Sequence, residues 1–317
     1  MGINLSIPIS ELGTRIWDRA RPLVARVSFE DRSLTVATGA PRGICRKGVL
    51  FVSEGRSDLV KAQIKSLVLT HPSLSVVELR ISDPLATADA INDAVQSISL
   101  VDAVIDVTAF RREELLMLLE VLRGIDSRKR RNCEIVYVSA GEMADTLSGK
   151  VTQTRSVVGF AGEIWPSRPT RLVVLMGFEI PRARAIIETY EPKHLILGRG
   201  RKSESISDDL WKKNDAFFKE LKSNYANVES TFEFSARDPL AVLTELEKAI
   251  PTSEPSNVVL APLHTKLSTI GVGLYAQRHR TAQICYAEVG AYNEETYSKV
   301  GNLAYVFQLT QLFNQRN

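Results

Sequence analysis

Residues 257–273 read NVVLAPLHTKLSTIGVG, and this stretch decides the fold class. A short apolar run at 258–260 stops at Pro262, and a polar turn at 264–266 then opens a segment whose apolar residues recur at helical spacing. This order is typical of a buried parallel strand that feeds a helix in an open α/β sheet. Such sheets bind their ligands outside the carboxyl ends of the strands. The stretch therefore predicts a pocket as well as a fold.

The turn at 264–266 combines an imidazole, a hydroxyl and an amine with the N–H groups of a helix start, which suits an anionic ligand. Lys266 is the strongest candidate, because a helix dipole disfavours a cation at this end and an anion would offset that cost. Its alternative role is a lysine that extends to solvent. His264 could serve as donor or acid/base, or as a structural imidazole, and Thr265 supplies the hydroxyl.

The composition limits the class of protein. A chain of 317 residues with 44% hydrophobic and 24% charged residues is typical of a globular protein of about two domains. The net charge of +3 is too small to indicate direct nucleic-acid binding. We find neither an apolar run of the roughly eighteen residues that cross a membrane nor the residue order of a signal peptide. We therefore expect a cytoplasmic protein without membrane contact.

The cysteines and histidines do not form a metal motif. Cys45, Cys133 and Cys285 lie far apart, each in or beside an apolar run, and are expected to be buried free thiols. The four histidines are equally scattered, and the Gly-Lys-Ser/Thr order of a phosphate-binding loop is absent. We expect neither a metal nor a cofactor.

Strand-like and helix-like segments alternate through most of the chain, which indicates parallel sheets covered on both faces. We predict an α/β fold of two Rossmann-like modules with pseudo-two-fold internal duplication. The predicted parts are an N-terminal arm at 1–47, a first module at 48–150, a connector at 151–170 and a second module at 171–317, which ends in a helix from about 294 to 312.

A repeat supports the duplication. Residues 82–86 read SDPLA and residues 237–241 read RDPLA, and similar elements follow each at nearly the same intervals. The turn at 53–57 then corresponds to the turn at 198–202, so the second copy would carry an additional strand and helix in front. Asp-Pro is also a common helix start, which explains these residues but not their shared order.

The carboxyl edges of the two sheets would collect small, hydroxyl and basic residues. The candidate ligand-binding residues are Ser53, Gly55, Arg56, Asp106, Thr108, Gly198, Arg199, Gly200, Arg201, His264, Thr265 and Lys266. In the 198–202 turn, the glycines would allow close approach and the cations would favour a phosphodiester, unless the turn is a solvated loop. Asp106 could be an acid, a metal ligand or a hydroxyl contact, or else a helix cap.

The stretch 257–273 resembles the strand–turn–helix signature of the CRISPR-associated Rossmann-fold ligand sensors. Thr265 and Lys266 fall on the last two positions of that family's hydroxyl-Gly-Gly-Thr-Lys turn, whereas 262–264 are larger than its small residues. The duplicated layout is similar to the fused SAVED form of the family. The resemblance implies that the protein binds a cyclic oligonucleotide in antiviral defence and acts alone or through a separate effector chain.

Two other functions remain open at this point. An enzyme, such as a transferase or hydrolase, could act on a phosphorylated or nucleotide-activated substrate in a cleft between the modules, with Asp106, Glu142 or His264 as acid/base. A scaffold subunit could use its aromatic C-terminal segment as a partner surface. The leading hypothesis is a sensor of an anionic nucleotide-like small molecule, as a monomer or a homodimer.

Overall fold

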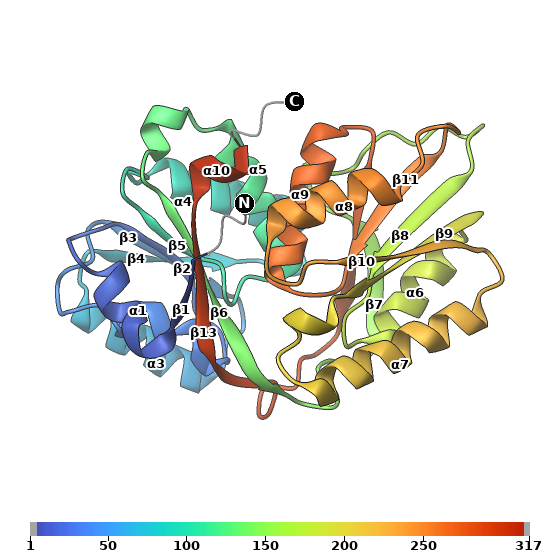
Figure 1. Cartoon of the computed structure of the whole chain (residues 1–317). Coiled ribbons are helices and arrows are strands. Elements are labelled where there is room, and N and C mark those ends of the chain that lie inside the picture. Colours follow the sequence, from blue (N-terminus) through green and yellow to red (C-terminus); the bar gives the residue numbers. More distant parts are fainter. Residues whose placement is uncertain (1–4, 314–317) are drawn as a thin grey trace. The chain divides into compact units, whose positions relative to one another are not determined.

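The computed structural model describes residues 5–313 and confirms an α/β fold with two mixed, largely parallel sheets (Figure 1). The chain folds into two units. We call residues 5–144 together with 294–313 the first module, and residues 145–293 the second module. Each has the strand and helix order of a Rossmann-like module.

The first module contains a seven-stranded sheet in the order β1-β13-β6-β5-β2-β3-β4. The five strands from β6 to β4 in this order are parallel, whereas β13 pairs antiparallel with β6 and with β1. The strands are β1 (Leu5–Pro8), β2 (Leu23–Arg26), β3 (Gly48–Ser53), β4 (Leu74–Leu79), β5 (Val104–Asp106), β6 (Glu134–Met143) and β13 (Ser298–Gln308).

Helices connect these strands and begin at the signals that the sequence carries. For example, Asp83 caps α4 by accepting a hydrogen bond from the Ala86 N–H, and Pro84 occupies the first helical position. The helices of this module are α1 (Ile9–Ile16), η1 (Asp31–Ser33), α2 (Thr35–Thr38), α3 (Asp58–Thr70), α4 (Pro84–Gln96), α5 (Arg112–Gly124), η2 (Ser127–Arg130) and α10 (Leu309–Phe313).

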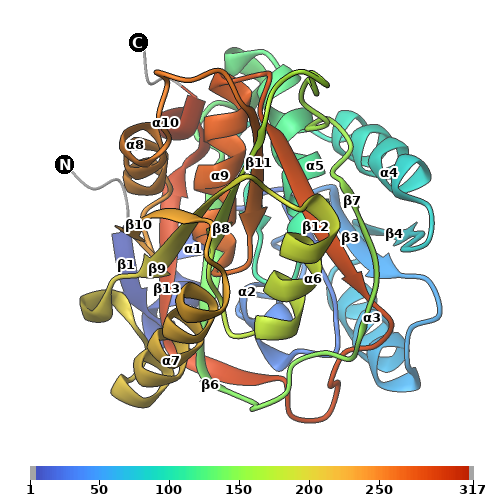
Figure 2. The ribbon, with the colours of Figure 1, turned by 90° about the vertical axis from the view of Figure 1, so that its right-hand side faces the viewer.

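The second module contains a six-stranded sheet in the order β10-β9-β8-β11-β12-β7, with only β7 antiparallel. Helices α6 and α7 cover one face of this sheet, and α8 and α9 cover the other (Figure 2). The elements are β7 (Val151–Ser156), β8 (Thr170–Leu175), α6 (Ile180–Tyr190), β9 (His194–Gly200), η3 (Lys202–Glu204), α7 (Asp208–Asn224), β10 (Val228–Phe234), α8 (Pro239–Ala249), β11 (Asn257–Pro262), α9 (Lys266–Arg278) and β12 (Gln283–Val289).

The two sheets repeat one topology. Numbered along the chain, the parallel strands β2–β6 and β8–β12 both lie in the order 3-2-1-4-5, and an antiparallel strand follows the fifth. The registers also agree, since Ala25 pairs with Asp106 in the first module as Val174 pairs with Ala261 in the second. Equivalent residues can therefore be assigned from strand pairing, and the predicted internal duplication is confirmed at the level of topology.

The antiparallel strands are exchanged between the two halves of the chain. Strand β7 follows β6 along the chain but pairs with β12, and β13 follows β12 but pairs with β6. The connecting segments are also hydrogen-bonded to each other: Ala144 N donates to Tyr297 O at 3.1 Å, and Asn293 N donates to Leu147 O at 3.0 Å. Each sheet is therefore completed by a strand that the chain reaches only after building the other half.

Two sequence predictions about the first module were wrong. Residues 23–26 were assigned to an N-terminal arm but form β2, the first parallel strand, and are buried throughout. Strand β2 and its connection are the counterparts of β8 and α6, so the second copy has no additional strand and helix in front among the described residues. A four-residue strand that is buried on both faces shows no alternation, which is why the pattern was missed.

Three other segments also differ from the prediction. Residues 298–308, expected in a C-terminal helix, form β13, and residues 151–156, expected in a connector, form β7. Residues 198–200, expected in a turn, continue β9. In all three cases pairing with a strand distant in sequence decides the conformation, and local propensity cannot report such pairing.

The β6–β13 pairing provides a direct test of the exchange. A Cβ at Gly301 would lie 2.8 Å from the Ser139 carbonyl oxygen and 2.4 Å from its hydroxyl. We expect Gly301→Ala to lower the free energy of unfolding by about 1–3 kcal/mol, because the strands must separate to admit the methyl group. Urea denaturation followed by circular dichroism measures the change.

Gly124→Ala is the matched control, since an added Cβ there meets no atom within 4 Å. It should not lower the urea midpoint, because alanine is a better helix former than glycine at this last position of α5. Equal midpoints for both variants would contradict the tight β6–β13 pairing.

Candidate ligand site at the carboxyl edges of the sheets

Arg26 lies across the carboxyl edge of the first sheet. Its Nε is 2.7 Å from Glu114 Oε2 in the first turn of α5, and its Nη2 donates to Ser53 Oγ at 2.5 Å. Its Nη1 donates to the Ala109 carbonyl oxygen at 3.4 Å. Arg26 and Glu114 are both buried. The guanidinium therefore joins the end of β3 and the segment after β5 to the start of α5. The Ser53 hydroxyl is used as an acceptor in this contact.

Asp106 ends β5 and is 1% exposed. Its Oδ1 accepts the Thr108 N–H at 2.9 Å, whereas Oδ2 has no hydrogen-bond partner among the described residues. Burial raises the pKa of Asp106 to about 7, although hydrogen bonds from Thr108 and the charge of Arg32 oppose this rise. Asp106 is not a helix cap, because Arg111 occupies the N-cap position of α5. The structure thus contains a buried carboxyl group that can exchange a proton near neutral pH.

The other candidates of the first module have structural contacts. Thr108 Oγ1 accepts the Val138 N–H at 2.9 Å and so joins the ends of β5 and β6. Arg56 forms a short ion pair with Glu78 on the neighbouring strand. Gly55 has a positive φ of 65°, which explains a glycine in this turn. Of the predicted set in this module, Ser53 ends β3 and the Asp106–Thr108 turn follows the end of β5.

In the second module, the turn at 264–266 follows β11, the fourth parallel strand, as the sequence predicted. Thr265 caps α9 by accepting the Ser268 N–H at 3.1 Å, and its hydroxyl donates to the Ala236 carbonyl oxygen at 2.8 Å. Lys266 is the first residue of α9 and is half-buried. Lys266 therefore stands at the positive, N-terminal end of a helix that is buried from Leu267 to Ala276.

His264 packs among aromatic and glycine residues. Its ring centroid lies 5.1 Å from that of Phe234 and 6.1 Å from that of Phe178. A Cβ at Gly200 would lie 2.9 Å from His264 Nε2, and a Cβ at Gly198 would lie 2.7 Å from the ring of Phe232. A side chain at either glycine would therefore require a neighbouring ring to shift.

The basic residues predicted in the 198–202 turn are matched by carboxylates. Arg199 pairs with Asp215 and, at 2.8 Å, with Glu233. Arg201 pairs with Glu204 at 3.3 Å and also with Glu245. The structure thus brings Gly200 close to His264, whereas the arginines form ion pairs of their own.

Sequence reasoning missed a buried Glu–Arg pair that occurs once in each module. Glu30 lies 2.7 Å from Arg32, and at the equivalent position Glu179 lies 2.9 Å from Arg182. All four side chains are buried. The repeated signal was Phe-Glu, at 29–30 and 178–179, followed by an arginine after one or two residues.

A serine of the exchanged segment binds the glutamate in each module. Ser298 Oγ donates to Glu30 Oε2 at 2.7 Å, and Ser148 Oγ donates to Glu179. The two serines take corresponding places, because Ser298 pairs with Met143 at the end of β6 and Ser148 pairs with Tyr292 shortly after β12. These clusters therefore attach each antiparallel strand to the start of its own module.

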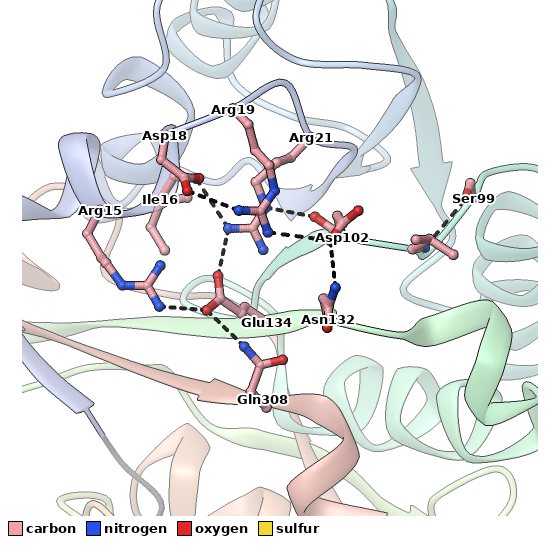
Figure 3. Close-up of polar contacts among 11 residues, drawn as sticks. Arg15, Ile16, Asp18, Arg19, Arg21, Ser99, Asp102, Asn132, Glu134 and Gln308 are labelled. Atoms are coloured by element: carbon pink, nitrogen blue, oxygen red, sulfur yellow. Dashed lines mark hydrogen bonds and ion pairs between the residues drawn. The ribbon is translucent and has the colours of Figure 1, made fainter.

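A second buried charge cluster lies at the opposite edge of the first sheet (Figure 3). Glu134 accepts hydrogen bonds from Arg21 at 2.6 Å, Arg15 at 2.8 Å and Gln308 at 3.0 Å. Arg21 is fully buried and also donates to the Asp102 carbonyl oxygen at 2.7 Å. Because Gln308 ends β13, this cluster holds the other end of the exchanged strand.

Comparisons with known proteins do not assign a family. No family model and no curated protein matches the chain. Among solved structures, one match is the cytoplasmic domain of a prokaryotic cation chloride cotransporter, with 11% identity, a TM-score of 0.25, and coverage of 87% of this chain and 96% of that one.

Within residues 5–313, none of the helices has both the length and the apolar character needed to cross a membrane. In the same part of the chain, no three His, Cys, Asp or Glu side chains converge as metal ligands would.

The raised pKa of Asp106 predicts a pH-dependent stability. In the folded protein the pKa of Asp106 is about 7, whereas the ordinary pKa is 3.8. Between these pH values the unfolded chain loses the proton and the folded protein keeps it, so the free energy of unfolding falls as pH rises. Asp106→Asn removes this penalty. We expect its free energy of unfolding, relative to wild type, to rise by on the order of 3 to 4 kcal/mol between pH 4 and pH 8.

Denaturant titrations at several pH values measure this difference. Asp89→Asn, at an exposed position on α4, is the control for loss of one negative charge. A flat difference for Asp106→Asn would contradict a buried, titrating carboxyl group.

Proposed function

We propose that this protein is a sensor of an anionic nucleotide-type ligand, bound at the carboxyl edge of the second module's sheet. One observation carries the proposal: α9 begins with Lys266 directly after β11, the fourth strand in a 3-2-1-4-5 order. The parallel strands β8 and β11 are neighbours, and the helices that follow them, α6 and α9, cover opposite faces of the sheet. Open α/β sheets bind their ligands at this point.

Electrostatics supports an anion. The first N–H groups of α9 and its dipole favour negative charge, and Lys266, the first residue of this helix, carries a full positive charge. The half-buried His264 imidazole lies two residues before the lysine and can donate a hydrogen bond. Together these groups suit a phosphate, with the aromatic rings of Phe178 and Phe234 nearby.

The ligand class follows from the resemblance of residues 257–273 to the CRISPR-associated Rossmann-fold sensors. A cyclic oligonucleotide is the expected member of this class, with a role in antiviral defence and signalling to a separate effector chain. The duplicated topology is compatible with this assignment, because the fused SAVED form of that family also contains two copies.

Lys266→Ala tests the proposal. Loss of a charge-assisted contact to a phosphate should weaken binding by about tenfold to a hundredfold. Isothermal titration calorimetry with a panel of linear and cyclic nucleotides measures the affinity, and thermal unfolding checks that the variant is folded.

Lys219→Ala is the matched control, because this lysine is 72% exposed on α7 and its ion pair with Asp215 lies away from the 264–266 turn in sequence. It should bind the nucleotides as wild type does. If none of the panel binds the wild-type protein, the proposed function is wrong.

Asp106 favours an enzyme as a second candidate function. A buried carboxyl group with a pKa of about 7 and an unpartnered Oδ2 among the described residues is suited to general acid/base work. The substrate would be phosphorylated or nucleotide-activated. An assay that measures product formation from such a substrate separates the two candidates. Loss of this activity in Asp106→Asn, with substrate binding retained, would favour an enzyme over a sensor.

A further inference from the structure

We infer that the crevice at the carboxyl ends of β2 and β5 is a guanidinium-binding site that the protein fills with its own Arg26. Strand β2 is the first parallel strand of its sheet and β5 the fourth, so their ends flank the point where the strand order reverses. This is the place in the first module that corresponds to the end of β8 and β11 in the second. Arg26 is the last residue of β2 and is 4% exposed.

The acceptors around Arg26 come from three separate elements. Glu114 supplies a carboxylate from α5, Ser53 supplies a hydroxyl from β3, and Ala109 supplies a carbonyl oxygen from the segment after β5. Nη1 and Nη2 of the planar group donate to Ala109 and Ser53, and its Nε edge forms an ion pair with Glu114 that lacks hydrogen-bond geometry. A compact ammonium group cannot span these three positions. The crevice is therefore selective for a guanidinium.

The second module has no such pair at the equivalent positions. Strand pairing aligns Arg26 with Leu175 and Ser53 with Gly200. The third residue of α5 is Glu114, whereas the third residue of α9 is Ser268. The duplicated crevices have thus diverged, and the first is closed by an internal ion pair.

This difference between the two modules predicts how many nucleotides bind to each chain. With the first crevice occupied by Arg26, one nucleotide should bind per chain, at the second module. This assignment rests on the proposed function, whereas the occupancy of the first crevice by Arg26 does not.

Chemical rescue tests the guanidinium site in the full-length protein. Arg26→Ala removes the nearest charge partner of the buried Glu114 carboxylate, which keeps the Arg111 N–H at 2.8 Å and the Arg111 side chain at 4.0 Å. We expect the melting temperature to fall by about 10 °C. Millimolar methylguanidinium chloride, far below the molar range of denaturation, should restore at least half of that loss. Sodium chloride at the same concentration should not.

The double variant Arg26→Ala with Glu114→Ala is the matched control, because it keeps the space but removes the carboxylate. Methylguanidinium should not stabilise it, and should not stabilise the wild-type protein. If Arg26→Ala does not fold, the same titration on Arg26→Gln decides the question. Equal melting temperatures of the single variant in methylguanidinium and in sodium chloride would overturn the inference.

Calorimetric stoichiometry tests the second part. A nucleotide that binds the wild-type protein should bind with one site per chain, and two sites per chain would overturn the closure of the first crevice. Absence of any nucleotide binding would count against the proposed function, while the rescue result would still decide the occupancy of the crevice.

Discussion

The antiparallel pairing of β13 with β6 and of β7 with β12 is the constraint on which both sheets depend. Strand β13 joins the first sheet only after the chain has formed the whole second module, whereas residues 145–293 contain every strand of the second sheet. Strand β13 is held along its length by main-chain pairing and near its ends by Ser298 on Glu30 and Gln308 on Glu134. Ordering a strand whose partners are distant in sequence costs conformational entropy. The contacts near both ends of β13 offset part of this cost.

The buried charged residues also help to hold the antiparallel strands in place. Arg21, Arg32 and Arg182 are buried with carboxylate partners, and several of those carboxylates also bind the exchanged segments. A buried ion pair contributes little net stability compared with apolar packing, but breaking it is costly. Such pairs are therefore better suited to fixing one register of the exchanged strands than to adding stability, since a slipped strand would leave a charge unpaired.

The comparison of the two modules separates what duplication preserved from what it changed. The Phe-Glu and arginine cluster after the first parallel strand and the Asp-Pro helix start after the third are present in both modules. The carboxyl edge differs, with Arg26, Asp106 and Glu114 in one module and His264, Thr265 and Lys266 in the other. Preserved residues hold the fold, and the diverged ones lie where ligands bind in such folds.

The sequence alone was sufficient for the α/β class, for the helix starts at Asp83 and Asp238, and for the strand–turn–helix at 257–273, because these signals are local. Periodicity, capping and turn chemistry act over a few residues and can be read from them. By contrast, β2, β7 and β13 were missed because their conformation depends on partners more than a hundred residues away or on burial without alternation.

The same limit applies to the site. The sequence placed Lys266 at a helix start. Only the tertiary structure revealed that Arg199 and Arg201 are paired with carboxylates and that Arg26 is buried against Glu114. A basic residue looks available in a sequence until its partner is known. That partner comes from another strand or helix, so only folding decides which charges remain for a ligand.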